Sequence, residues 1–232
     1  MFTNPDPKGF FDAIAFWNRG HGIVLGDPVD GHFAIFTTED GGDTWQRQQG
    51  PEAAKDEGAF AASGTALTVY GHQLAWFGTG GTGGARVFRS TDGGRTWLVA
   101  TTAIRHDSAS AGIFSLAFED ELHGEAVGGD YAHPEDSIRT SARTDDGGKT
   151  WDSPPGSPAA GYRSAVTFIP GRTGTLIAVG AKGCDVSIRN GYYWNRFSSE
   201  GFNALSAAPD GSVWAAGAKG KISKLTIGEA EK

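Results

Sequence analysis

The sequence predicts an all-β protein, a β-propeller of four-stranded antiparallel blades, with about five blades in this chain. Three observations carry this prediction. An eight-residue turn motif of the form Ser/Thr-x-Asp-x-Gly-x-Thr-Trp recurs along the chain. The tryptophans of this motif, including a degenerate fourth copy, stand at positions 45, 97, 151 and 194, so successive copies lie 52, 54 and 43 residues apart. An apolar run that ends in glycine precedes each copy, as expected for a strand that leads into a loop.

Short apolar runs predict the strands of each blade in order. The innermost strand is rich in small residues, because the blades crowd together at the axis; its copies are 11–16, 59–63, 113–118, 163–168 and 202–206. The second strand ends in glycine, and its copies are 22–26, 74–78, 124–128, 176–180 and 213–217. The third strand precedes the turn motif, as at 85–89, and the fourth follows it, as at 98–100. The last repeat offers a third strand at 221–225, and no segment requires a helix.

The turn motif is interpreted as the tight connection of a β-hairpin between the third and fourth strands. Its glycines supply the positive φ values that such turns need, and its Asp and Ser/Thr side chains accept backbone N–H groups of the same turn. The tryptophan packs the turn onto its neighbour. Catalytic or metal-binding aspartates are the alternative, and the structural role is favoured. The residues assigned this role are Thr38, Asp40, Gly42, Trp45, Ser90, Asp92, Gly94, Trp97, Thr144, Asp146, Gly148, Trp151, Ser187, Gly191 and Trp194.

The repeats form one predicted domain, residues 1–228, followed by a polar tail at 229–232. The repeats cover approximately 9–50, 57–101, 111–153, 161–198 and 201–227. The last repeat lacks a fourth strand, and residues 2–4 are expected to be the end of a preceding blade's outer strand. We therefore expect one of three arrangements: a fragment of a larger ring, a short closed ring, or open blade edges that pair with another copy, since exposed edge strands favour such pairing.

The motif resembles the Asp-box of BNR-repeat β-propellers, which include sialidases, sortilin-type receptors and photosystem II assembly factors. The whole chain looks like the carboxy-terminal portion of a photosystem II stability/assembly factor-like (Ycf48-like) propeller. In these families the Asp-boxes lie at the periphery, away from the binding face, and Ycf48-like propellers assist the assembly of membrane complexes. Similar repeats are widespread in bacteria and many are exported, so the resemblance implies a periplasmic or secreted full-length protein, although this chain carries no signal-peptide pattern.

Composition excludes several functional classes. The formal net charge of the 232 residues is −7 and no Lys/Arg cluster occurs, which argues against a nucleic-acid surface. The single cysteine, Cys184, excludes an internal disulfide framework and a cysteine-rich zinc site. No apolar run approaches the roughly 18 residues of a membrane span.

One face of the predicted propeller carries both the loops between second and third strands and the connections between blades. We expect the binding residues on this face, because function tends to sit on loops held by a rigid scaffold. They are Asp12, Asp27, Asp130, Tyr131, His133, Tyr162, Arg163, Lys182 and Asn203. For Asp12 and Arg163 the alternative is an axial salt bridge or a solvated channel lining. The acidic loop 130–136 has the composition of a metal site, but its spacing matches no known metal loop. A solvated loop is favoured there, and no metal site is predicted.

The sequence favours a non-catalytic scaffold that binds a protein or a small ligand on its loop face, similar to assembly and stability factors. The alternative is a sialidase or BNR-type glycoside hydrolase, or a glycan-binding propeller. A sialidase needs an arginine triad, a Tyr-Glu pair and an acid/base Asp, for which Tyr162, Arg163, Glu57 and Glu200 are the nearest candidates. The Arg-Ile-Pro motif typical of sialidases is absent, since residues 168–170 read Phe-Ile-Pro. A xyloglucanase-like module is a third possibility, and it requires a cleft that one short propeller cannot supply.

No cofactor is predicted. Residues 78–83 fit the pattern Gly-x-Gly-x-x-Gly, but a strand and a turn motif follow them instead of the helix that a dinucleotide site needs. The expected partner is therefore an unidentified protein, small molecule or glycan.

Overall fold

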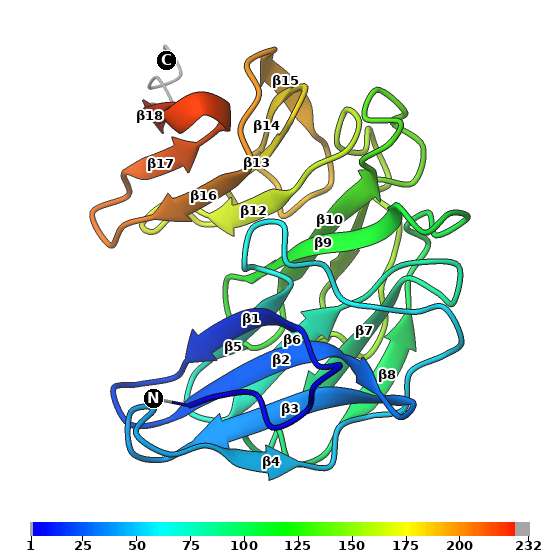
Figure 1. Ribbon diagram of the computed structural model, residues 1–232. Coiled ribbons are helices and arrows are strands. Elements are labelled where there is room, and N and C mark those ends of the chain that lie inside the picture. The colour runs from blue at the N-terminus through cyan, green and yellow to red at the C-terminus, as the bar shows by residue number, and fades with distance from the viewer. Residues whose placement is uncertain (1, 226–232) are drawn as a thin grey trace.

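The protein folds into five antiparallel β-sheets that follow one another around a common axis (Figure 1). The computed structural model describes residues 2–225, which contain eighteen strands and one short 3-10 helix, η1 (Ala218–Gly220). Each sheet is a meander whose strands pair in the order of the chain. The predicted all-β propeller class is confirmed.

The sheets are numbered here in chain order. The first contains β1 (Phe11–Phe16), β2 (Gly22–Val29), β3 (His32–Thr38) and β4 (Gln46–Gln48). The second contains β5 (Leu67–Tyr70), β6 (Leu74–Gly78), β7 (Arg86–Ser90) and β8 (Leu98–Thr101). The third contains β9 (Ala111–Phe118), β10 (Gly124–Asp130) and β11 (Ser141–Thr144). The fourth contains β12 (Ala165–Phe168), β13 (Leu176–Gly180), β14 (Gly183–Ser187) and β15 (Asn195–Ser198). The fifth contains β16 (Ala204–Ala207), β17 (Val213–Ala216) and β18 (Ile222–Leu225).

Burial along the second strand of each sheet reflects the position of that sheet in the series. Every residue of β10 and of β13 is buried, because neighbouring sheets cover both faces of these strands. In β17 the residues alternate instead, with Val213 and Ala215 buried and Trp214 and Ala216 exposed. This alternation is expected of a sheet that is covered on one face only.

Apolar side chains from facing sheets form most of the core, with one cluster at each of the four interfaces between neighbouring sheets and a fifth on the free face of the first sheet. Between the first and second sheets, Phe33 contacts Phe77 edge-to-face with ring centroids 5.1 Å apart, and Phe77 stacks on Phe88 at 4.6 Å. Between the fourth and fifth sheets, Val179 packs with Phe202. Aromatic pairs of this kind add to the stabilisation that apolar burial provides.

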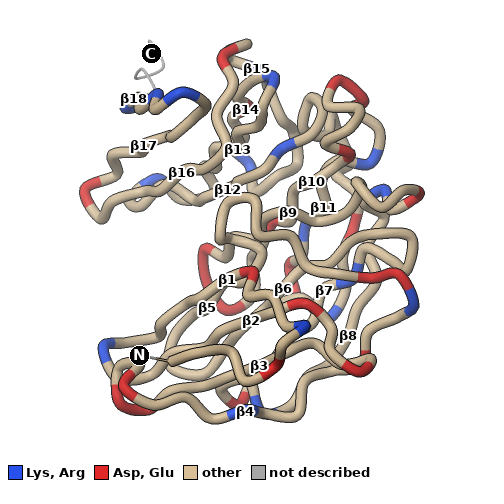
Figure 2. The backbone as a smooth tube through the Cα atoms, viewed as in Figure 1, with Lys and Arg blue, Asp and Glu red and all other residues tan. Residues whose placement is uncertain are grey.

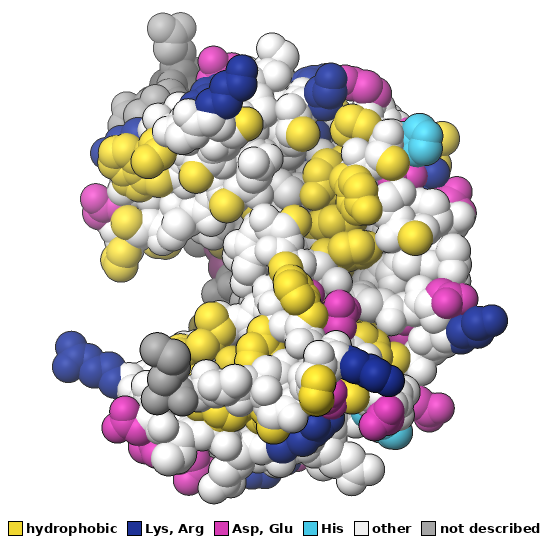
Figure 3. Space-filling model, viewed as in Figure 1, with side chains coloured by type: hydrophobic (Ala, Val, Ile, Leu, Met, Phe, Trp, Pro, Cys, Tyr) yellow, Lys and Arg dark blue, Asp and Glu magenta, His cyan; other side chains and the backbone are white. Residues whose placement is uncertain are grey.

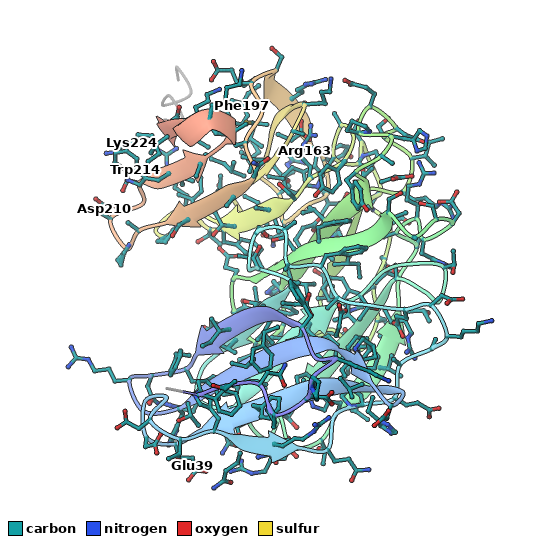
Figure 4. All side chains as sticks on the ribbon, in the orientation of Figure 1. Glu39, Arg163, Phe197, Asp210, Trp214 and Lys224 are labelled. Carbon is teal, nitrogen blue, oxygen red and sulfur yellow. The ribbon has the colours of Figure 1, made fainter. Side chains whose placement is uncertain are left out.

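The series of sheets does not close into a ring. The inner strands β1, β5, β9, β12 and β16 contact one another in this order. Figure 3 shows a deep notch between the first and the fifth sheet. On the fifth sheet Trp214, Asp210 and Lys224 lie along the side that borders the notch (Figure 4). Charged residues are concentrated in the loops and turns (Figure 2), in keeping with strands that are buried between sheets.

The first turn motif is closed by its own side chains. Thr38 Oγ1 accepts the backbone N–H of Gly42 at 2.9 Å and donates to the Asp40 carboxylate at 2.7 Å. Asp40 accepts the backbone N–H of Thr44 at 2.9 Å and its hydroxyl at 2.6 Å, and Trp45 Nε1 donates to Gly42 O at 3.1 Å. The hydrogen bonds from Thr44, followed by that from Thr38, lower the pKa of Asp40 to about 2. The turns at 90–97 and 144–151 repeat the Ser/Thr and Asp bonds at nearly the same distances.

The degenerate fourth turn is held in a different way. Ser187 Oγ still accepts the backbone N–H of Gly191, at 3.1 Å. Trp194 Nε1 donates to the carboxyl of Glu125 on β10 at 3.3 Å, instead of to a carbonyl of its own turn. A glutamate from the preceding sheet therefore supplies the acceptor for this tryptophan.

Several expected strands differ from the structure. The inner strand of the second sheet is β5 (Leu67–Tyr70), and the expected strand at 59–63 is wrong. In that segment the Phe60 ring stacks on Phe114 with ring centroids 3.9 Å apart, and Gly64 turns the chain with a φ of +71°. These residues connect the first and second sheets across the loop face, and β5 forms only after this turn.

Two further differences concern the blade edges. The third sheet has three strands, because Asp152 forms only an isolated bridge with Arg143 where a fourth strand was expected. Residues 2–4 form no strand; Phe2 packs on the rings of Phe11, Phe36 and Trp45 and covers the free face of the first sheet. The predicted repeat end at 226–227, residue 228 and the polar tail at 229–232 lie outside the described residues.

Candidate functional site

A pocket of about 490 Å³ opens on the face that carries the loops between second and third strands. We call it the loop-face pocket. It lies where the first two sheets and the segment before β9 meet, and its lining comes from residues distant in sequence. The lining residues are Lys8, Asp27, Pro28, Asp56, Glu57, Gly58, Ala59, Phe60, Gly80, Gly81 and Ala109.

Two β-bulges re-aim a pair of aspartates, of which Asp27 lines this pocket and Asp12 is buried on β1. Asp12 is the extra residue of β1, since Phe11 pairs with Gly26 and the next residue, Ala13, pairs with Leu25. Asp27 is the extra residue of β2 in its pairing with β3. Bulges re-aim side chains and often occur next to functional sites.

The Asp12 and Asp27 carboxyl groups differ in their partners. Asp27 Oδ1 accepts the backbone N–H of Ala59 at 3.1 Å. Asp12 is 7% exposed, and its Oδ2 is buried without a hydrogen-bond partner. Burial, and then the charge of Asp27, raise the pKa of Asp12 to about 7, and burial raises that of Asp27 as well. The pair therefore holds a proton near neutral pH.

A row of aromatic rings, Phe60, Phe114, Tyr131 and Tyr162, runs from the pocket across the third sheet. The rings of Phe114 and Tyr162 lie 4.8 Å apart edge-to-face, and those of Phe114 and Tyr131 lie 6.0 Å apart. Phe114 is the bulged residue of β9, as Asp12 is of β1. Tyr131 is 55% exposed, so the row offers apolar surface to a ligand beside the pocket.

The wall of the pocket is fixed by a buried hydrogen-bond network around Glu57. Glu57 forms an ion pair with Arg86 of β7, accepts the hydroxyl of Thr79 at 2.5 Å and accepts the backbone N–H of Ala54 at 2.8 Å. A side chain at Gly80 would collide with the Phe60 ring, so glycine is required where that ring lies flat on the loop. The wall is therefore preorganised, and its only ion pair is internal.

The acidic loop that follows β10 is organised by its own hydrogen bonds. Asp130 is 1% exposed and accepts bonds from Ser108 Oγ at 3.2 Å, Ala132 N at 2.9 Å and His133 Nδ1 at 3.0 Å. Burial opposes ionisation of Asp130, but the hydrogen bonds from serine, His133 and Ala132 outweigh it and hold the pKa well below its usual range. Arg105 also pairs with Asp136 of this loop. Asp130 is therefore engaged within the protein, whereas Tyr131 and His133 are exposed.

Arg163 lies inside the fourth sheet and not at the axis (Figure 4). Its Nε donates to Asp185 Oδ2 at 2.8 Å, and both side chains are fully buried. Its other nitrogens donate to the carbonyls of Tyr162 and Ala160, at 2.9 and 2.8 Å. The alternative predicted for this arginine was an axial salt bridge. The structure does show a salt bridge, but the partner is Asp185 on β14, so the pair is internal and not axial.

The remaining candidate residues do not converge with the pocket. Lys182 pairs with Glu135 at 3.6 Å in the exposed loops of the third and fourth sheets. Asn203 is exposed and accepts the Ser164 hydroxyl through its backbone carbonyl at 2.7 Å. Tyr162 is buried, and burial raises its pKa. Of the nine candidates, only Asp27 lines the loop-face pocket.

Two other hollows carry less chemistry. One of about 470 Å³ lies between the inner strands β5, β9 and β12; its acid, Glu119, already accepts the backbone N–H of Gly174 at 2.8 Å. Another, of about 100 Å³, lies beside the first two turn motifs, where Glu39 (Figure 4) and Arg95 form an exposed ion pair at 3.0 Å. Neither hollow is lined by a buried carboxylate without a hydrogen-bond partner, which is the state of Asp12.

Within residues 2–225 no group of three or more His, Cys, Asp or Glu side chains is arranged to hold a metal ion. Over the same residues, no helix is long and apolar enough to cross a membrane.

Sequence reasoning missed Phe60, Glu57 with its partner Arg86, and Asp185. Phe60 was assigned to an inner strand because it stands in a run of small apolar residues. Glu57 was noted only as a possible hydrolase residue. No local signal links Glu57 to Arg86, 29 residues later, or Asp185 to Arg163, because only the folded sheets bring these pairs together.

Comparisons with known proteins support the fold. Neither a protein-family model nor a curated protein sequence matches this chain. Among solved structures, YCF48 bound to D1 peptide aligns with a TM-score of 0.59 at 17% identity, over 97% of this chain and 68% of that chain. The GH74 enzyme of Niastella koreensis aligns with a TM-score of 0.59 at 14% identity, over 88% of this chain and 33% of that enzyme. The WD40 propeller domain of Doa1 aligns with a TM-score of 0.57 at 13% identity, over 94% of this chain and 65% of that domain.

These identities are low, so the alignments establish the fold and not a shared activity. The chain spans about two thirds of the YCF48 and Doa1 propellers and one third of the GH74 enzyme. The five meander sheets, their order around an axis and these alignments agree. This chain is a β-propeller whose ring is open, and YCF48 is among the proteins that it resembles in structure.

Proposed function

We propose that this chain is a non-catalytic propeller that binds a segment of another protein at the loop-face pocket. The observation that carries the proposal is the pocket itself, where the Asp27 carboxylate and the Phe60 end of the aromatic row line the same cavity. Binding sites of this kind combine apolar surface with a few placed polar groups. The YCF48 structure, with its D1 peptide, is an instance of a similar propeller that binds a peptide.

Burial of Asp12 argues for binding over catalysis. A general acid must reach the atom that it protonates, within about 3 Å or through one water. Asp12 Oδ2 is closed off from solvent, so the raised pKa comes from burial and not from exposure to a substrate. The carboxylate that lines the pocket is Asp27, which is already bonded to Ala59 N.

Glycoside hydrolysis is the second candidate, and one observation favours it. Two carboxyl groups with raised pKa values, here Asp12 and Asp27, are the groups that a glycosidase uses as acid and as base or nucleophile. The GH74 neighbour shows that a similar propeller occurs in a glycosidase. Release of reducing ends from xyloglucan, or of sialic acid from a sialoside, that is abolished by Asp27→Asn would replace the binding proposal with this one.

Selection from a phage-displayed library of random nine-residue peptides tests the binding proposal. We expect enriched peptides whose affinity, measured by fluorescence polarisation, falls at least about tenfold in Phe60→Ala, as removal of a well-packed aromatic contact does at interfaces. Leu98→Ala is the matched control, because Leu98 is an exposed apolar residue on β8, away from the pocket. Absence of enriched peptides, or equal losses in both variants, would contradict the proposal.

Two predictions from the sequence stay predictions: residence of the full-length protein outside the cytoplasm, and association between copies through the open sheets. Exposed apolar side chains support the prediction of association, since Trp214 is 48% and Ile222 71% exposed on the last sheet. Large apolar side chains on an unpaired sheet favour such association.

A further inference from the structure

We propose that copies of this chain associate head to tail, with the free face of the fifth sheet in one copy packed on the free face of the first sheet in the next. The first of these is called the trailing face; its side chains are Ala204, Ser206, Trp214, Ala216, Ile222 and Lys224. The second is called the leading face; its side chains are Ile14, Phe16, Val24, Phe36 and Trp45. The inference names the two faces that meet when copies associate, and it is independent of peptide binding at the loop-face pocket.

Trp214 holds a position that every other sheet buries. It points away from the fourth sheet, because its neighbours Val213 and Ala215 belong to the core cluster with that sheet. The residues at this position of the second strand in the first four sheets are Ile23, Trp76, Glu125 and Ile177, and all four are fully buried. Trp214, which borders the notch, is half exposed (Figures 3 and 4).

Ile222 repeats this pattern on the third strand. It pairs with Ala216, lies on the same face as Trp214 and is largely exposed. The residues at its position in the first four sheets are Ile35, Val87, Ser141 and Cys184, and none is more than 2% exposed. The trailing face therefore has the pattern of an interface between sheets, and no sheet within residues 2–225 covers it.

The leading face has the matching pattern. Ile14 pairs with Val24 and is 56% exposed. The residues at its position in the second, third and fourth sheets are Leu67, Leu116 and Val166, and each is buried against the preceding sheet. The leading face therefore lacks the sheet that would precede it among the residues that the structure describes. Exposed apolar faces of this kind mark interaction surfaces.

Phe2 occupies part of the leading face without obstructing this pairing. Its ring lies edge-on to Phe36 at 5.2 Å, as the ring of Phe33 lies edge-on to Phe88 of the second sheet at 5.4 Å. Gly220 of the fifth sheet corresponds to Phe33, since each stands two residues before the third-strand position described above. The incoming fifth sheet therefore has no side chain at the place that Phe2 fills.

A second copy is the occupant because the two uncovered faces are of opposite kind. In the series of sheets each trailing face packs on the leading face of the next sheet, so each copy supplies the face that the other lacks. The contact between the second and third sheets gives the register. There Trp76 lies against Gly148 and its Nε1 donates to Gly147 O at 2.8 Å, and Gly78 lies beside Leu116. Between copies, the corresponding contacts are Trp214 with Gly42 and Ala216 with Ile14.

Charge favours the same arrangement. Lys224 holds the position that Arg89 holds on the second sheet, and Arg89 lies beside the third turn motif. Between copies, Lys224 therefore lies beside the first turn motif of the next molecule. That turn carries three acids, Glu39, Asp40 and Asp43, whereas the second and third turn motifs have a basic residue at the place of Asp43. Opposite charges across an interface help to select the partner and fix its register.

A complementation experiment tests the pairing by light scattering. Ile14→Lys places a charge on the leading face and Trp214→Lys places one on the trailing face, both at exposed positions. Each variant alone should associate at least about tenfold more weakly than the wild type, as expected when an interface anchor is lost. Their equimolar mixture should form a dimer of one copy of each, because an intact trailing face then meets an intact leading face. Leu98→Lys, at an exposed apolar residue of β8 on neither face, is the control and should behave as the wild type.

Cysteine cross-linking tests the register of the same pair. Ala216→Cys and Ile14→Cys should form a disulfide when mixed and none when each is oxidised alone, since Cys184 is buried. Association that survives Ile14→Lys would show that two trailing faces meet and would overturn the inference. A wild-type chain that stays monomeric at high concentration, or a mixture that associates without the disulfide, would overturn it as well. None of these results bears on peptide selection at the loop-face pocket, so the proposed function stands or falls separately.

Discussion

Glu125 is a carboxyl group buried between the third and fourth sheets, and its replacement by glutamine provides a sharp test of the energetics of this fold. Its side chain is fully buried against Gly191 of the fourth turn motif. Ile23 and Trp76 occupy the equivalent positions against the second and third turn motifs. Oε1 accepts Trp194 Nε1 at 3.3 Å, and Oε2 has no partner. Burial raises the pKa of Glu125 well above its usual value of 4.5.

The sign of the effect follows from that shift. Because the folded state raises the pKa, the folded protein binds a proton that the unfolded chain releases above pH 4.5. Stability from this proton is fully present below pH 4.5 and is lost as the pH rises through the folded-state pKa. Glutamine keeps an oxygen for Trp194 and removes the charge, so Glu125→Gln should be nearly neutral at pH 4.5 and stabilising at pH 8.

The expected gain at pH 8 is about 1–3 kcal/mol, the cost of one buried polar group without a partner. For a chain of this size each kcal/mol shifts the melting temperature by about 2–4 °C. Urea and thermal unfolding of both proteins at pH 4.5 and pH 8 measure the effect. Glu121→Gln, at an exposed position on the neighbouring turn, is the control and should change stability by less than about 0.5 kcal/mol. A variant that is destabilised at pH 8, or a difference that does not depend on pH, would refute the reasoning.

Three further predictions concern the scaffold. Arg163→Met leaves Asp185 buried without its cation and should cost about 3–5 kcal/mol in urea unfolding, whereas adding Asp185→Leu should restore most of the loss; equal stability of the single and double variants would contradict this. Asp92→Ala removes the acceptor that closes the second turn motif and should lower stability by about 1–2 kcal/mol, as measured by thermal unfolding, and a neutral result would show that the tryptophan alone holds the turn. Light scattering should detect association of the 24.3 kDa chain, which the pair Trp214→Lys and Ile222→Lys should abolish; a wild-type monomer at high concentration would exclude contacts through this sheet.

Much of the fold could be predicted because its signals are local. The turn at 38–45 is closed by hydrogen bonds among Thr38, Asp40, Gly42 and Thr44, each between residues no more than four apart, so the motif by itself specifies the hairpin. The four copies of that motif, with one more set of apolar runs after the last copy, then indicate five sheets in chain order. The prediction was wrong at 59–63, where a run of small apolar residues has the composition of an inner strand. There the stacking of Phe60 on Phe114, 54 residues later, decided the path of the chain.

The candidate site was predicted less well. Loop-face residues were chosen from their place in the repeat. This choice included Asp12 and Asp27, but it also included Arg163, whose charge is neutralised by an ion pair inside the fourth sheet. The sequence cannot distinguish an acid that is paired from one that is not, because the partner comes from another strand. The paired bulges that bring Asp12 to Asp27 are likewise a property of strand register.

The sequence by itself therefore determined the repeated unit: its strands, its glycine turns and the tryptophan that packs each turn onto its neighbour. These features depend on backbone conformations and hydrogen bonds between residues that are close in the chain. Only the tertiary structure decided which charges are neutralised, where the pocket opens and that the first and fifth sheets leave the ring open. Each of these depends on which side chains meet across sheet interfaces, and there burial removes the water that would otherwise satisfy them.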